Sequence, residues 1–321
     1  MLTRRSILAS ALAVPFAARA QSWPTDLVKI IIPTAAGGAL DTIARLIHSQ
    51  LQQRLGVTIV IENRTGASST IGAAAVAKSQ PDGGTWLFAA DSIIAGSLIL
   101  PNVGYDVQKD LDPVTMVADG PMVLCAHPSR PWRNLPDIVA AAKAKPDSIT
   151  CATTGAGGTG HLSTMALSKR TGMRLVNVPY RGGGPAVNDT VAGHTDTIMS
   201  SAATLAQQIE AGKLRPLVQC GAKRAAFLPD VATAQENGIS DFQAGSWYAF
   251  FAPAGTPAPL VEQFYNAVVA IVGEKRMHDE IAGKFRVELP LLNPRELRAV
   301  IARQVPTWAE VIRENNIKGG G

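Results

Sequence analysis

The chain has 321 residues, 46% of them hydrophobic and 17% charged, a globular composition that excludes a disordered, coiled-coil or collagen-like protein. The formal net charge of +5 falls to +2 when residues 1–20, which hold three arginines and no acid, are set aside. Because little basic charge remains and only 5% of residues are aromatic, nucleic acid is excluded as the main partner. The length accommodates two domains of ordinary size.

The N-terminal segment predicts an export signal. Two adjacent arginines precede an apolar stretch over residues 7–18, and Ala18-Arg19-Ala20 has the small-x-small pattern of a cleavage site. The stretch is too short for a permanent anchor, and no later segment reaches about 18 consecutive apolar residues. We therefore expect residues 1–20 to be a signal peptide, cleaved near Ala20, and the mature protein to be soluble and periplasmic. The two arginines leave both Sec and twin-arginine export open.

Strand-like and helix-like segments alternate along the rest of the chain. Short apolar or β-branched runs predict strands, and apolar residues spaced three to four apart predict helices. The predicted strands cover residues 27–32, 57–61, 85–89, 122–126 and 149–152, and the predicted helices cover 40–55, 71–78, 135–144, a segment from Thr159 and a late helix capped by Asn293. This alternation predicts an α/β fold with mainly parallel sheets covered by helices.

Two segments interrupt the alternation and predict where the chain passes between two lobes. Residues 116–121 follow a predicted turn at 110–113, and Gly245-Ser246-Trp247 precedes another apolar run. A lobe boundary placed in each segment assigns residues 21–119 plus 247–321 to lobe 1 and residues 120–246 to lobe 2. A chain that crosses twice between lobes forms a hinge.

Two Gly-rich loops each lead from a predicted strand into a helix start: Pro33 to Ala39, and Thr153 to His161. Helix N-termini expose unsatisfied N–H groups and a partial positive charge, so both loops suit an anion. The second loop matches G-x-G-x-x-G, but residues 173–182 lack the acid of a dinucleotide site, and His161 stands where a P-loop has lysine. Plainer alternatives stay open: Gly37-Gly38 forms only a tight turn, and His161 packs or caps its helix.

No catalytic motif is present: the sequence lacks G-x-S-x-G, H-E-x-x-H, S-x-x-K and any Cys/His cluster with metal-ligand spacing. We therefore expect a protein that is not an enzyme and needs no metal or cofactor. A hydrolase that uses His161 with Ser163 or Ser200 is the weaker alternative. The three cysteines, which lie in strand-like runs, are expected to be free and buried, although a Cys125–Cys151 disulfide stays open.

Motifs that follow one another along nearly the whole mature chain resemble the tripartite tricarboxylate transporter substrate-binding family, the Bug receptors. They include Ile31-Ile32-Pro33, Gly37-Gly38 and residues 41–45, then Ile61-Glu62-Asn63-Arg64-Thr65-Gly66-Ala67 with 71–73, then 81–83, 105–106, 109–114, 155–162, 178–182, 211–215, 228–231 and 252–257. The resemblance implies a periplasmic-binding-protein-like Venus flytrap of two α/β lobes joined by a hinge. It also implies a receptor, expected to be a monomer, that delivers a small carboxylate to integral membrane transporter subunits.

The resemblance implies a ligand site with residues from both lobes. We expect Thr34, Ala36, Gly37, Gly38, Asp41 and Ser92 in lobe 1, and Thr154, Gly155, Gly157, Thr159, His161 and Ser200 in lobe 2. This chain departs from the family pattern at Thr34, usually an aromatic, at Leu40, often Ser or Thr, and at Ser200, often Asp. Without that Asp a ligand ammonium loses a partner, so a mono- or dicarboxylate or an aromatic acid is expected rather than an amino acid. A ligand-sensing subunit for a signalling kinase is the alternative, which the neighbouring genes would distinguish.

Overall fold

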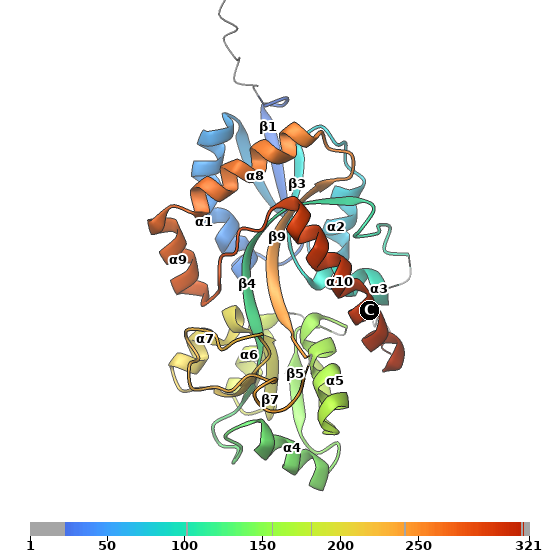
Figure 1. Cartoon of the computed structure of the whole chain (residues 1–321), viewed down its shortest axis with the longest axis vertical. Coiled ribbons are helices and arrows are strands. Elements are labelled where there is room, and N and C mark those ends of the chain that lie inside the picture. The colour runs from blue at the N-terminus through green and yellow to red at the C-terminus, as the bar shows by residue number, and fades with distance from the viewer. Residues whose placement is uncertain are drawn as a thin grey trace, which may run out of the picture.

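The computed structural model describes residues 23–100, 102–155, 157–180, 182–240, 242–315 and 317. The predicted signal peptide, residues 1–20, lies outside them. Figure 1 shows two α/β lobes, one above the other, connected by two long strands. The predicted fold of two α/β lobes is confirmed.

Lobe 1 is built on three parallel strands in the order β2–β1–β3. The strands are β1 (Leu27–Ile32), β2 (Thr58–Asn63) and β3 (Thr85–Ala90), and the helices that connect or cover them are α1 (Ala39–Leu55), η1 (Ala67–Ser69), α2 (Thr70–Ala77), α3 (Ser92–Ile99), α8 (Ala258–Val272) and α9 (Lys275–Phe285). An aromatic stack holds α8 to the sheet, because the rings of Trp86 and Phe264 lie 4.0 Å apart. The predicted strands and helices of this half are confirmed to within a few residues.

Lobe 2 contains a second set of parallel strands in the order β7–β5–β6. Its strands are β5 (Thr150–Thr153), β6 (Val176–Pro179), β7 (Thr197–Ser201) and β8 (Arg215–Gln219), and its helices are α4 (Leu135–Ala144), α5 (Thr159–Thr171), α6 (Gly183–Val191) and α7 (Ala202–Glu210). Buried apolar side chains from β5, β7, α6 and α7 form a core of their own.

Two long strands join the lobes: β4 (Leu111–Ala126) and β9 (Gly245–Pro253) run antiparallel side by side. The prediction of a turn at 110–113 and a break at 116–121 was wrong, because residues 111–126 form one continuous strand. The register between β4 and β9 shifts after Pro113 and after Met116, which marks two bulges. Proline has no backbone N–H to donate, and a bulge tolerates that loss better than a regular part of the hydrogen-bond ladder does. We propose that the lobe boundaries lie at 119/120 in β4 and at 246/247 in β9.

The last helix, α10 (Pro294–Glu314), spans both lobes. It begins after the predicted N-cap, Asn293, where a capping box forms: the Asn293 side chain accepts the N–H of Glu296, and the Glu296 carboxylate accepts the N–H of Asn293. It packs against α3 and β4 and then against α5. A continuous buried cluster therefore runs from lobe 1 beneath α10 to lobe 2.

The fold shows the state of the three cysteines. Cys125, Cys151 and Cys220 are free and buried, as predicted, and burial raises the pKa of the Cys220 thiol to about 12. Across the described residues, no three His, Cys, Asp or Glu side chains gather as a metal site requires. Within the same residues, no helix has both the length and the apolar character needed to cross a bilayer.

Candidate functional site

The first Gly-rich loop wraps around a buried carboxylate. Gly38 is the N-cap of α1, and Gly37, with φ +84°, donates its N–H to Asp41 Oδ2 at 2.9 Å. Asp41 also accepts from Arg45 Nε at 3.0 Å and Asn63 Nδ2 at 3.1 Å. Burial acts to raise the pKa of Asp41, but these three donors outweigh it and hold the pKa below its usual value. Asp41 is thus a paired acid within the first turn of α1 rather than its N-cap.

The second loop repeats this arrangement with an imidazole. Gly158 is the N-cap of α5, and Gly157, with φ +73°, donates its N–H to His161 Nδ1 at 3.0 Å. In both loops, therefore, the glycine before the N-cap bonds to the third residue of the helix. Burial lowers the pKa of His161, which favours the neutral ring that this hydrogen bond needs. This hydrogen bond occupies Nδ1 of His161, which is consistent with the alternative that His161 packs against its own loop.

Backbone N–H groups remain available at both helix starts. No acceptor among the described residues takes the N–H groups of Ala39, Leu40 and Asp41 in α1, or those of Thr159 and His161 in α5. Such groups favour a carboxylate, because their dipoles point out of the helix end. Beside the glycine that Asp41 or His161 binds, each helix start therefore offers N–H groups that no described residue accepts.

The two lobes meet through α3. Asp91, which immediately precedes α3, is 1% exposed. Its Oδ2 accepts from Thr159 Oγ1 at 2.7 Å, and its Oδ1 accepts from Ser246 Oγ at 2.9 Å. At the other end of α3, Ile99 lies against Gly157 so closely that an added Cβ would be 2.3 Å from Ile99 Cδ1. The second loop therefore lies along α3 of lobe 1.

The sequence did not single out Asp91, although burial raises its pKa to about 7 against the opposing effect of the two hydroxyl donors. Its partners lie 68 and 155 residues away in the chain, which no local pattern reports. The one available signal was an acid placed directly after an apolar strand, a position that parallel sheets use for functional side chains.

The other predicted ligand residues differ in their exposure and in their hydrogen-bond partners. Ala36, Gly37 and Gly38 are exposed, whereas Thr34 has an enclosed Oγ1 with no hydrogen-bond partner among the described residues. Ser92 bonds to Ser69 at 3.2 Å, which brings the strained loop around Ser69 (φ +74°) to the start of α3. Thr154 and Gly155 are half-buried. Ser200 is 2% exposed in β7, where it pairs with Val123.

No catalytic pair forms around His161 in the described residues. Ser163 is fully buried and its Oγ has no hydrogen-bond partner among them, while His161 Nδ1 is bonded to Gly157. The nucleophile–base contact of the hydrolase alternative is therefore missing.

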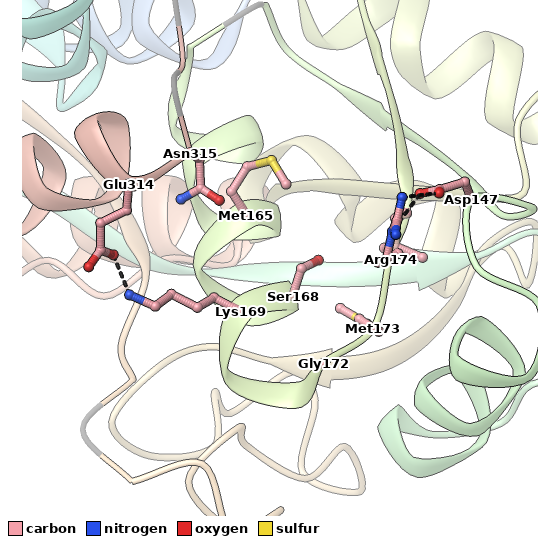
Figure 2. Close-up of a pocket in the computed structure, with 10 residues that line it drawn as sticks. Asp147, Met165, Ser168, Lys169, Gly172, Met173, Arg174, Glu314 and Asn315 are labelled. Carbon is pink, nitrogen blue, oxygen red and sulfur yellow. Dashed lines mark hydrogen bonds and ion pairs between the residues drawn. The ribbon is translucent and has the colours of Figure 1, made fainter.

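A separate groove of about 580 Å³ lies on α5 near the end of α10. Figure 2 shows its two ion pairs, Lys169 with Glu314 and Arg174 with Asp147, on either side of Met165 and Met173. None of the predicted ligand residues lines this groove. It is therefore distinct from the site predicted at the Gly-rich loops.

The comparison with known proteins decides the family. A family model described as the tripartite tricarboxylate transporter family receptor matches residues 43–317. The chain belongs to this family. Its members are solute receptors, so the expectation that the chain is not an enzyme is confirmed.

Relatives of this receptor cover almost its whole length. Protein BugT of Bordetella pertussis is 32% identical over 314 residues, which span 97% of this chain and 95% of BugT. The structure of R. palustris Rpa4515 with adipate is 30% identical, has a TM-score of 0.84, and covers 92% of this chain and 99% of its own. MatC from Rhodopseudomonas palustris with bound malate is 29% identical, has a TM-score of 0.81, and covers 90% and 99%.

Proposed function

We propose that this receptor binds a small dicarboxylate in the periplasm, between its two lobes, and delivers it to the membrane subunits of a tripartite transporter. The observation that carries the proposal is the pair of helix starts, α1 in one lobe and α5 in the other. Each lies behind a Gly-rich loop and has N–H groups that no acceptor in the described parts of the chain takes. Two anion-binding ends in two lobes suit a ligand with a carboxylate at each end.

The ligands of two related proteins support the same chemical class. One structure holds adipate and the other malate, and both compounds are dicarboxylates. In this receptor, Arg45 at the first loop is already paired with Asp41, and burial keeps His161 neutral. The proposed ligand carboxylates are therefore held by N–H and hydroxyl dipoles rather than by a dedicated cation.

The proposed roles of the predicted residues differ. Thr34, Ala36, Gly38, Ser92, Thr154, Gly155 and Ser200 stay candidates for direct ligand contact. Asp41 and His161 instead hold Gly37 and Gly157, so we assign them the positioning of the two loops. Thr159 offers its backbone N–H, because its hydroxyl is engaged by Asp91.

A thermal-shift series tests the proposal. We expect adipate, malate or a dicarboxylate of similar length to raise the melting temperature, whereas the dimethyl ester of the same acid does not. A ligand that binds only the folded state stabilises it by about 2.7 kcal/mol at about 100 times its Kd. The ester keeps the shape and loses the charge that helix ends favour. Equal shifts from an acid and its ester would contradict the proposed anion site.

A further inference from the structure

Both ends of α3 touch the second Gly-rich loop. At one end Asp91 accepts a hydrogen bond from Thr159, and at the other Ile99 packs on Gly157. These contacts join lobe 1 to the start of α5 in lobe 2. The loop that we propose to enclose a ligand is therefore held at two points by α3 and the residue that precedes it, in the opposite lobe.

Asp91 is unusual among these contacts because it is an enclosed acid that forms no ion pair within the part of the chain that the structure describes. A second acid, Asp119 on β4, acts on Asp91 and helps to raise its pKa. Burial raises the pKa of Tyr248 on β9 to about 12, and the charge of Asp91 adds to that shift. On α5 the titratable side chain closest in sequence to Thr159 is His161, which burial keeps neutral. Burying a carboxylate is costly unless hydrogen bonds compensate, so the hydroxyls of Thr159 and Ser246 carry that role.

We propose that Asp91 is a positioning residue for ligand capture: its bond to Thr159 holds the start of α5 against lobe 1 while the ligand is enclosed. The inference rests on the proposed function, because it assumes that the ligand lies between the Gly-rich loops. Separating the lobes would take Thr159 away from Asp91 and return the carboxylate to water. The Ser246 bond, by contrast, fixes Asp91 to strand β9 beside the proposed hinge.

The contact predicts a change in dissociation kinetics, measured with adipate as the ligand. Asp91→Ala and Thr159→Val are each expected to release adipate about tenfold to a hundredfold faster, the effect of losing one hydrogen bond to a charged group. Thr159→Ser keeps the hydroxyl and is expected to restore the parent rate. The double variant is expected to be no worse than either single variant, since both remove the same bond.

The pH profile provides a readout that a purely structural role would not change. An anionic ligand near Asp91 disfavours its ionised form, so binding takes up protons, and affinity is expected to fall as the pH rises through the raised pKa of Asp91, about 7. Asp91→Asn, which is neutral throughout, is expected to flatten this dependence. Ser246→Ala, which keeps the Thr159 bond, is the matched control and is expected to retain it.

Small-angle X-ray scattering of the ligand-free protein separates this inference from the proposed function. Asp91→Ala is expected to increase the radius of gyration, because the lobes lose a contact, whether or not adipate binds. If the parent protein does not bind adipate, the radius of gyration of the ligand-free proteins alone tests the inference. A folded Asp91→Ala variant with the parent radius overturns the inference, and so do an unchanged release rate and pH profile where adipate binds. Additive losses in the double variant overturn it as well.

Discussion

Replacing Gly160 by alanine is expected to destabilise the receptor by about 1–3 kcal/mol, the usual cost of forcing an extra group into a packed core. A Cβ at this position would lie 2.6 Å from the backbone carbonyl oxygen of Met199 in β7. A strand backbone in the middle of a sheet cannot move aside as a flexible side chain can. The free energy of unfolding, measured by chemical denaturation of the full mature chain, checks the prediction.

Gly283 provides the matched control, because it is also a helical glycine. It lies in α9, where an added Cβ would meet nothing within 4 Å. Gly283→Ala is therefore expected to stabilise the protein by about 0.5–1 kcal/mol through the lower backbone entropy of the unfolded chain. If the free energy of unfolding changes in the same direction in both variants, the packing of α5 on β7 is not as close as in the structure.

Gly157→Val is expected to weaken carboxylate binding at least about a hundredfold while leaving the lobes folded, as losing several hydrogen bonds to a charged ligand would. The new side chain would enter the space of Ile99 Cδ1 and force a β-branched residue into φ +73°. Both effects keep the second loop from its place along α3. Calorimetric titration measures the loss, and circular dichroism verifies the fold.

Two further variants separate the steric effect from backbone strain. Gly212→Val imposes a similar strain, at φ +66°, where nothing lies within 4 Å, and it is expected to bind like the parent. Adding Ile99→Ala to Gly157→Val makes room at the loop and is expected to recover part of the affinity. If Gly157→Val itself binds normally, the ligand lies elsewhere and this loop is only a turn.

Local signals explain which parts of the fold the sequence predicts. The helices follow from apolar spacing, and the start of α10 follows from Asn293, Pro294 and Glu296, whose capping box needs only neighbouring residues. The long strand β4 was missed because Pro113 and Pro121 are typical of breaks. Pairing with β9, which lies far along the chain, keeps residues 111–126 extended, with bulges absorbing the irregularity.

The site, like the fold, is predictable from sequence only where its features depend on residues that are close together in the chain. The two helix starts are visible in sequence, because a Gly-rich loop after a strand is a local feature. Whether Asp41 and His161 turn toward a ligand or back onto their own loops is decided by side-chain packing, which the pattern does not contain. Asp91 depends on Thr159 and Ser246, residues brought to it only by the assembled lobes.

The place of β9 in the sheet also sets an order of assembly. This strand lies between β3 and β4, yet it is synthesised after every strand of lobe 2. Strands β1, β2 and β3 can pair with one another early, as can β5, β6 and β7, but the edge of β3 gains its neighbour only after lobe 2 has been synthesised. A nascent or truncated chain that ends before Gly245 leaves the edges of β3 and β4 unpaired, and unpaired strand edges are where separate chains join and aggregate.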